Sequence, residues 1–187
     1  MSGGGFALPV DPSGMVGAEA AGRKKRSISN LAVWSLSSCK QGFGVTQLRD
    51  GDTATYWQSD GPQPHLVNLQ FAKKMHIREI ALYADYGQDE SYTPHDVSIR
   101  AGTSYHDLQE VKHLELTEPD GWVTIPLEGP GGKPLRANMI QFAVLSNHQN
   151  GRDTHLRQLE VFTSLAPLLP PMIPFTSDEC AAFGCVR

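Results

Sequence analysis

Short runs in which apolar residues occupy every second position recur through this chain, and they constrain its fold more than any other feature. In the stretch HLVNLQF, Val67, Leu69 and Phe71 share one face, with polar residues between them. Successive side chains of a strand point to opposite faces of its sheet, so this alternation predicts strands with one buried face. The same pattern recurs at Ile80–Ala84, Val97–Ala101, Val123–Leu127, Ile140–Val144 and Leu159–Val161.

Turn-forming residues separate these runs. They lie at Asp60–Pro62, Thr93–Pro94, Asp120–Gly121, Gly129–Gly132 and Asn150–Gly151. Many short strands at such spacing are typical of a β-sandwich or barrel, and two stacked sheets leave loops at both ends. The helical candidate in this region is Gly44–Asp50, with one or two turns. We therefore predict an all-β fold.

The chain has 187 residues, which suits one domain with tails. Residues 1–29 are rich in Gly, Ala and Ser and are predicted to be a flexible arm. Its basic run, Arg23–Arg26, is open to two interpretations, a nuclear localisation patch or solvated charge. Residues 30–163 form the predicted sandwich. Residues 164–187 begin with a proline-rich stretch that cannot continue a sheet, so we expect a linker and a C-terminal tail there.

Composition excludes several classes of function. A net charge of -4 and a pI near 5.9 provide no basic surface for nucleic acid. No apolar run approaches the roughly 18 residues of a membrane span, and no secretory signal is visible. The three cysteines, Cys39, Cys180 and Cys185, lack C-x-x-C spacing. That pattern argues against a disulfide framework or a zinc site and favours a reducing compartment.

Polar residues gather in three loops. In Leu48–His65, Asp50 and Asp52 are either calcium ligands or turn residues that bond their own backbone, and we expect Trp57 in the core. Ala84–Asp96 is acidic and carries Tyr86 and Tyr92. It is either a solvated connection or a binding loop, since Tyr is favoured in contact surfaces.

The third loop, Ser146–Gln158, holds two histidines, two asparagines, two arginines, an aspartate and a glycine. His148, Asp153 and His155 are candidates for a general base, its orienting partner, or metal ligands. However, the sequence has no nucleophile elbow, HExxH motif or phosphate-binding glycine loop. A loop rich in donors and acceptors at one end of a sandwich fits recognition of a polar peptide or sugar better.

Three stretches resemble a known family. Ala32–Phe71, Asp89–Pro94 (DESYTP) and Leu145–Gln158 (LSNHQNGRDTHLRQ) closely resemble the DOC-domain subunit of the anaphase-promoting complex, or cyclosome. The resemblance covers about Leu31–Phe162 and the last residues. It implies a jelly-roll β-sandwich of the galactose-binding or discoidin type. It also implies a protein without catalytic activity or cofactor, found in the nucleus and cytoplasm.

The resemblance also implies a function. Such a subunit recognises substrates for a cullin-RING-type multi-subunit ubiquitin ligase in cell-cycle control. With a propeller-type activator, it forms the receptor for the destruction box of mitotic cyclins and securin, and it raises processivity. Its C-terminus docks on a tetratricopeptide-repeat scaffold subunit. Here Val186–Arg187 stands where the family has Ile-Arg.

Carried onto this chain, the resemblance assigns degron binding to the third loop and to parts of the other two. The expected residues are Ser146, Asn147, His148, Gln149, Asn150, Gly151, Arg152, Asp153, His155, Tyr56, Gln58, Ser59, Asp60, Ser91 and Tyr92. Arg152 either contacts the degron or pairs with an acid to hold the loop, and Gly151 serves backbone geometry. Trp57 and Thr154 are expected to support the loops.

Two rival functions remain for the same sandwich. One is a lectin that binds a sugar or another small ligand, since fold does not fix function. The other is a hydrolase that uses His148, Asp153 and His155. No metal ligand set is assigned.

Overall fold

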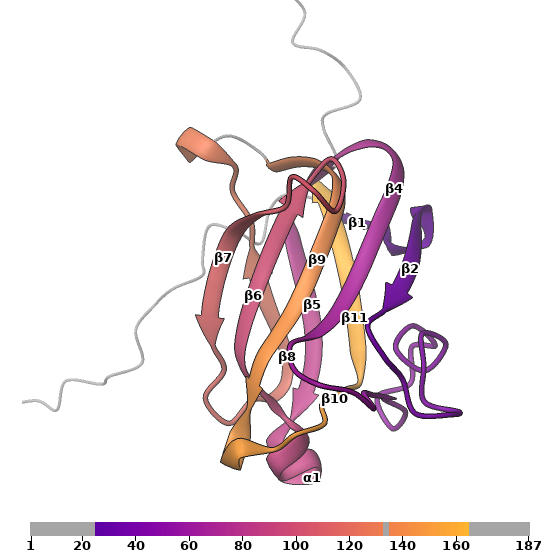
Figure 1. Cartoon of the computed structure of the whole chain (residues 1–187). Helices are drawn as coiled ribbons and strands as arrows, with labels where there is room; N and C mark the ends of the chain where they lie inside the picture. Colours follow the sequence, from indigo (N-terminus) through magenta and orange to yellow (C-terminus); the bar gives the residue numbers. More distant parts are fainter. Residues whose placement is uncertain (1–24, 133–134, 165–187) are drawn as a thin grey trace, which may run out of the picture.

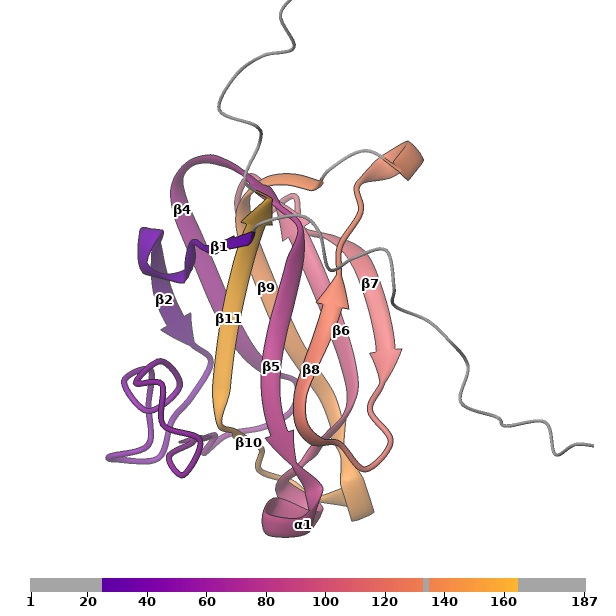
Figure 2. The same cartoon turned by 180° about the vertical axis from the view of Figure 1, so that it is seen from behind.

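The computed structural model describes residues 25–132 and 135–164, which form two stacked antiparallel β-sheets (Figures 1 and 2). The larger sheet has the order β2 (Ala32–Leu36), β4 (His65–Ile77), β9 (Leu135–Asn147), β6 (Pro94–Gly102) and β7 (Gln109–Glu115). The smaller has the order β1 (Lys25–Ser27), β11 (Gln158–Ser164), β5 (Glu79–Asp85) and β8 (Asp120–Pro126). A two-stranded ribbon pairs β10 (His155–Leu156) with β3 (Trp57–Gln58). The predicted all-β architecture is confirmed.

The core lies between the two sheets and is built from the alternating residues. Val67, Leu69 and Phe71 of β4 are buried, and so are Ile80 and Leu82 of β5 from the facing sheet. Burying apolar surface between two sheets is the main favourable contribution to such a fold. Trp57 of β3 is fully buried in the core as expected, and its Nε1 donates to Ser38 O at 3.0 Å.

Strand β7 was not predicted from the sequence, because its pairing with β6 is irregular. The register of β6 against β7 shifts between Ile99 and Arg100, where a bulge interrupts the alternation. As a result, Val111 and Leu114 both pack against the core although they are three positions apart. A bulge inserts one unpaired residue, so a strict period of two is lost.

The folded body begins before the predicted boundary at residue 30. Lys25–Ser27, assigned above to the arm, form β1 and pair with β11. Lys25 Nζ lies 2.7 Å from Glu79 Oε1, and Ile28 is fully buried. The sequence did not indicate β1, because this segment has few apolar residues. The strand is stabilised by its pairing with β11. The rest of the predicted arm, residues 1–24, lies outside the described residues.

The helices also differ from expectation. Gly44–Asp50 forms hydrogen-bonded turns, with one helix-type bond from Leu48 N to Gly44 O, and no helix. The short α-helix is α1 (Tyr86–Asp89), in the acidic loop. Asp85 caps it by accepting a hydrogen bond from Gln88 N, a standard N-cap arrangement. The single-turn 3-10 segments are η2 (Ser29–Leu31), η3 (Glu90–Tyr92), η4 (Pro130–Gly132) and η5 (His148–Asn150).

The topology gathers the three polar loops at one end of the sandwich. Strands β5 and β9 end there, and β4, β6 and β11 begin there, beside α1 (Figure 1). Antiparallel neighbours alternate in direction, so loops far apart in sequence meet at a common end. Among the described residues, no helix is long and apolar enough to cross a membrane.

Candidate functional site

The three loops meet in a surface that we call the rim. It consists of residues 37–64 between β2 and β4, residues 86–93 in α1 and η3, and residues 148–157 around η5 and β10. Backbone hydrogen bonds join these segments. Ser59 N donates to Thr154 O, and His148 N donates to Thr93 O. The rim is therefore one connected structure.

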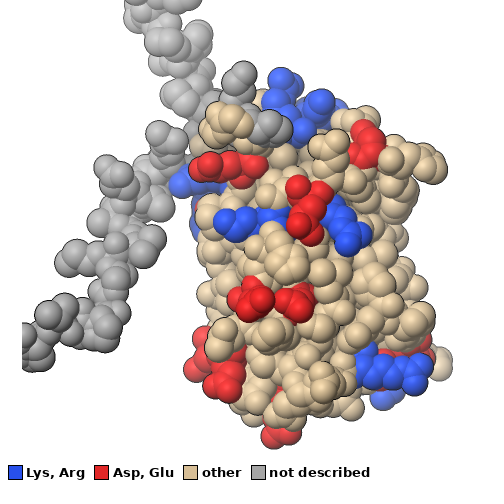
Figure 3. Space-filling model, turned by 60° about the vertical axis from the view of Figure 1, so that its left-hand side comes forward, with Lys and Arg blue, Asp and Glu red and all other residues tan. Residues whose placement is uncertain are grey.

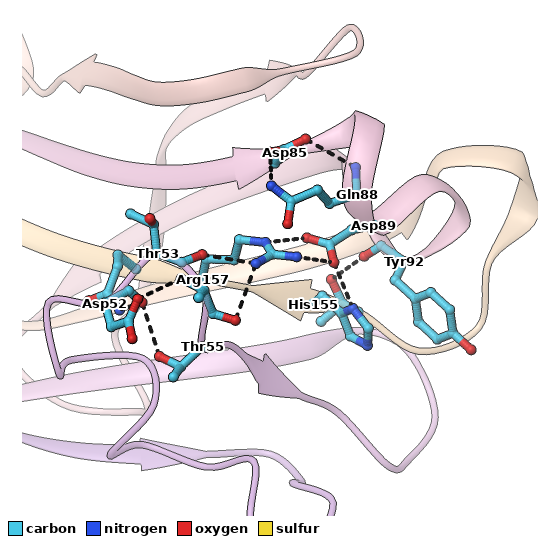
Figure 4. Close-up of polar contacts among 12 residues, drawn as sticks. Asp52, Thr53, Thr55, Asp85, Gln88, Asp89, Tyr92, His155 and Arg157 are labelled. Carbon is cyan, nitrogen blue, oxygen red and sulfur yellow. Dashed lines mark hydrogen bonds and ion pairs between the residues drawn. The ribbon is translucent and has the colours of Figure 1, made fainter.

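A buried ion pair lies at the centre of the rim (Figure 4). Arg157 donates to both carboxylate oxygens of Asp89, with Nε–Oδ2 at 2.8 Å and Nη2–Oδ1 at 2.9 Å. His155 Nδ1 lies 3.0 Å from Asp89 Oδ1. Arg157 Nη1 also donates to Thr53 O and Ala54 O in the first loop. One arginine thus connects all three segments.

This environment perturbs the titration of both partners. Burial raises the pKa of Asp89, but hydrogen bonds from His155 and Arg157, with their charges, outweigh it and hold the pKa below its ordinary value. Burial lowers the pKa of Arg157, but the Asp89 carboxylate outweighs it and raises the pKa above its ordinary value. Asp89 is therefore ionised and Arg157 protonated at neutral pH.

A row of stacked rings flanks the ion pair. The His155 ring lies between Tyr56 and Tyr92, with centroid distances of 4.2 Å on both sides. Phe43 extends the row, with its centroid 5.1 Å from that of Tyr56. The outer ring, Tyr92, is 39% exposed. The row therefore runs from the partly buried Phe43 to the exposed Tyr92.

The turn at η5 is held by a close approach of two backbones. A Cβ on Gly151 would lie 1.7 Å from Ser91 O, so only glycine fits there. Gly151 has φ of -58°, so space rather than a left-handed backbone demands glycine. Asn147 Nδ2 donates to Gly151 O and Asp153 O, which fixes the turn from inside.

The carbonyl of Arg152 is clamped from the neighbouring loop. His65 Nε2 lies 2.7 Å from Arg152 O, and Gln63 Nε2 donates to Gly151 O at 3.0 Å. The Arg152 side chain is exposed and forms no ion pair with the described residues. Of its two predicted roles, pairing with an acid to hold the loop is absent in the described part of the chain.

The structure separates the predicted degron-binding residues by exposure. Ser59, Asn147 and His148 are buried. Their side chains form hydrogen bonds to the backbone of the rim and so support the loops. The partly buried members are Ser146, Gly151, Asp153, His155, Tyr56, Gln58 and Ser91. The exposed members are Gln149, Asn150, Arg152, Asp60 and Tyr92. Thr154 is fully buried, as expected for a supporting residue.

Sequence reasoning did not assign Asp89 or Arg157 to the site. Asp89 stood among several acids of the second loop, and Arg157 directly precedes a strand. Nothing in the sequence shows that they pair, since 68 positions separate them. The one sequence signal for a buried charge was the position of Arg157, directly before the apolar strand β11.

The hydrolase candidates are not assembled as a catalytic group. His148 Nδ1 lies 3.1 Å from Thr93 O, and its Nε2 accepts from Glu118 N. His155 pairs with Asp89 instead of Asp153. Among the described residues, no group of three or more His, Cys, Asp or Glu side chains could hold a metal.

The oxygens considered for calcium are occupied by protein donors. The buried Gln158 amide donates to Gln47 O at 3.1 Å, to Asp50 Oδ1 at 2.8 Å and to Asp52 O at 2.8 Å. Thr55 Oγ1 donates to Asp50 Oδ2 at 2.7 Å. The loop is thus organised as a set of turns around an amide.

Other predictions fall outside the described residues. Val186 and Arg187, the proline-rich linker, and Cys180 and Cys185 all lie beyond residue 164. Cys39, within the described part, is an exposed free thiol.

Comparison with known families matches most of the chain. The sequence profile described as "Anaphase-promoting complex, subunit 10 (APC10)" matches residues 10–183. Anaphase-promoting complex subunit 10 of Bos taurus is 60% identical over 138 residues, covering 74% of this chain and 75% of the relative. The Homo sapiens protein of the same name is 59% identical over 138 residues, covering 74% of this chain and 75% of the relative. Subunit DOC1 of Saccharomyces cerevisiae is 36% identical over 138 residues, covering 73% of this chain and 55% of the relative.

Solved structures match the fold. The family 32 CBM from C. perfringens NanJ in complex with galactose has a TM-score of 0.62 at 14% identity, covering 75% of this chain and 100% of that one. CpGH89CBM32-5 from Clostridium perfringens, in complex with GalNAc-beta-1,3-galactose, has a TM-score of 0.62 at 11% identity, covering 74% and 100%. These matches confirm the galactose-binding type of jelly roll. At such identity they do not extend sugar binding to this chain.

Proposed function

Because this chain belongs to the anaphase-promoting complex subunit 10 family, we propose that it is a non-catalytic destruction-box co-receptor of that ubiquitin ligase. In this proposal the rim and a propeller-type activator hold the degron of mitotic cyclins or securin between them. Slower substrate release then raises ubiquitination processivity. We also propose that the protein acts in the nucleus and cytoplasm, where such substrates occur.

One observation carries the proposal: polar side chains without internal partners stand on a fixed backbone at the rim. Asn150, Arg152 and Asp153 form no side-chain hydrogen bond or ion pair with the described residues. Their backbone is nevertheless held by Asn147, His65 and the Gly151–Ser91 contact. Free polar groups on a rigid frame lose little conformational freedom on binding, which suits an extended peptide.

A second attachment belongs to the tail. Val186–Arg187 would supply an apolar β-branched residue and a guanidinium to a tetratricopeptide-repeat subunit. One methylene fewer than Ile costs about 0.8 kcal/mol if fully buried, so docking is weakened but retained. The proline-rich segment would tether the tail to the body and raise its effective concentration at the scaffold.

The test replaces the three rim side chains that have no partner among the described residues and measures substrate dwell time. In the variant N150A/R152A/D153A, we expect a labelled destruction-box substrate to leave the assembled ligase sooner and to receive fewer ubiquitins per encounter. The complex should still incorporate the variant, because its tail is intact. Single-molecule dwell times and the length of ubiquitin chains give the two readouts.

A matched control alters three exposed residues away from the rim, in Q109A/K112A/R136A. This variant should behave as the wild type in both readouts. Unchanged dwell time in the rim variant, with normal incorporation, would remove the rim from substrate binding. Loss of incorporation by the rim variant alone would assign the loops to assembly.

A further inference from the structure

The proposed function gives no role to the basic run before the sandwich. Arg23–Arg26 is the one stretch of four consecutive basic residues in the chain, and Ser27 follows it directly. By contrast, Figure 3 shows Lys and Arg side chains beside Asp and Glu on the side of the molecule where β7 lies. A serine after a cationic segment suits protein kinases whose substrate groove is acidic, because complementary charge selects the substrate.

Ser27 is accessible on an edge strand. It is the last residue of β1, whose three residues are all exposed, and β1 pairs with β11 alone among the described strands. The Ser27 hydroxyl donates one hydrogen bond, to Ser29 Oγ at 3.3 Å. The next residue, Ile28, is fully buried, so the segment has to leave β11 briefly to enter a kinase groove. Short terminal segments open locally at a small cost in free energy.

A cavity of about 250 Å³ lies beside Ser27. Its lining includes Ser27 and Ser29, Arg49 from the first loop of the rim, and Glu160 of β11. A water molecule takes up about 30 Å³ in the liquid, so the cavity has room for a phosphate group. A phosphate on the Ser27 hydroxyl would therefore enter a space that Arg49 also borders.

Arg49 forms no ion pair with the described residues. Its Nη2 donates to Asn30 Oδ1 at 2.8 Å and to Ser29 O at 3.5 Å. The guanidinium carbon lies 4.8 Å from the centroid of the Trp34 ring, which holds the group in place. These contacts leave Nε and Nη1 without a hydrogen-bond partner in the described part of the chain. Guanidinium groups bind phosphate through paired N–H donors, so Arg49 has the free donors that a phosphate requires.

The other charges around the cavity set where a phosphate would lie. Phosphoserine carries a charge of about -1.5 to -2 at neutral pH. Lys25 is already paired with Glu79, with Nζ and Oε1 2.7 Å apart. Glu160 borders the same cavity and repels an anion. A phosphate is therefore drawn to the Arg49 side of the cavity, away from the Glu160 carboxylate.

We propose that Ser27 is phosphorylated by a kinase that prefers basic substrates, and that Arg49 binds the phosphate within the cavity. In the transfer, Ser27 Oγ forms a bond to the γ-phosphorus of ATP, the bond from that phosphorus to the β–γ bridging oxygen breaks, and ADP leaves. The hydroxyl proton passes to the catalytic carboxylate of the kinase. The bound phosphate then joins β1 to the first loop of the rim and holds β1 against β11. Neither step depends on degron binding.

The first test treats the full chain with ATP and a purified kinase that prefers basic residues two and three positions before serine, where Lys25 and Lys24 stand. Peptide mass spectrometry should locate the phosphate on Ser27 in the wild type, and S27A should lack it. R23Q/K24Q removes two cations outside the described residues, so it keeps every described contact and should slow transfer about tenfold. No phosphate on Ser27, phosphate on Ser29 instead, or an unchanged rate in R23Q/K24Q would overturn the proposed site.

The second test measures hydrogen–deuterium exchange of residues 25–31, which reports the opening of β1. Phosphorylation should slow this exchange about tenfold in the wild type and in the control R136Q, which removes another exposed arginine. In R49Q, phosphorylation should leave the exchange unchanged. Comparing the modified and unmodified forms of each variant cancels any effect of the substitution on stability. Equal slowing in R49Q, or no slowing in the wild type, would overturn the binding of the phosphate by Arg49.

Discussion

Asp89 and Arg157 form a two-point ion pair between α1 and the residue that precedes β11, and both side chains are 5% exposed. Arg157 also binds the carbonyls of Thr53 and Ala54. Planar guanidinium groups suit such bidentate contacts, which fix orientation as well as distance. The pair therefore sets the relative positions of three loops whose outer residues are proposed to meet the degron.

Replacing Asp89 by Asn should destabilise the protein strongly. The variant leaves Arg157 buried without its counter-charge, and breaking a buried pair from one side costs about 3–5 kcal/mol. Urea unfolding followed by circular dichroism measures the free energy of unfolding. The control is D60N, because Asp60 is an exposed rim carboxylate, and it should change that free energy by less than about 0.5 kcal/mol. A D89N loss as small as that of D60N would show that the pair contributes little.

The same carboxylate predicts how stability depends on pH. The pKa of Asp89 is lower in the folded protein than the ordinary value of an aspartate, so ionisation stabilises the fold. That stability is complete above the unfolded pKa and is lost as pH falls through the folded pKa. Asp50, Asp107 and Glu110 also have lowered pKa values, but D89N retains them. The difference between wild type and D89N should therefore shrink on acidification below about pH 4, and parallel curves would contradict the assignment.

Much of the sandwich could be predicted because its strands obey the period of two. The alternation of Val67, Leu69 and Phe71 predicts a buried face even when the partner strands are not known. Strand β1 could not be predicted in this way, since its residues are exposed and its stability comes from pairing with β11. The helix α1 had a local signal, an N-cap Asp followed by Gln three residues later, but it lies within a loop rich in turn formers.

The candidate site was predictable as a set of loops and less so as a network. The family motifs indicate the right segments, yet exposure within a motif is a tertiary property. Asn147 and Asn150 stand three residues apart in the same motif, and one is buried while the other is exposed. The Asp89–Arg157 pair and the stacking of His155 between two tyrosines depend on contacts between distant segments.

Gly151 should tolerate no side chain. In G151A the new Cβ would overlap Ser91 O, so the η5 turn and the η3 segment must separate. We expect a loss of about 1–3 kcal/mol in the free energy of unfolding, together with shorter substrate dwell. The control is G44A, where an added Cβ would lie 3.8 Å from Cys39 Sγ, an ordinary contact. Comparable stability of the two variants would indicate that the turn adapts without cost.

Calcium should have no effect on the wild-type protein, because a side-chain amide takes the position between the loop oxygens. Gln158 Nε2 contacts Gln47 O, Asp50 Oδ1 and Asp52 O, while its Oε1 accepts from Gly51 N. Neither calcium nor a chelator should shift the wild-type unfolding temperature. Q158E replaces the donor by a carboxylate facing three oxygens, so it should be destabilised by about 1–3 kcal/mol.

Calcium should then restore part of the stability of Q158E, since oxygen ligands and added negative charge suit that ion, and binding to the folded state alone stabilises it. Magnesium, which requires a tighter octahedral arrangement, should restore less. The control Q109E adds the same charge on exposed β7 and should not respond to calcium. A calcium-dependent rise in the wild-type unfolding temperature would show that the ion displaces the amide and that the loop is a true metal site.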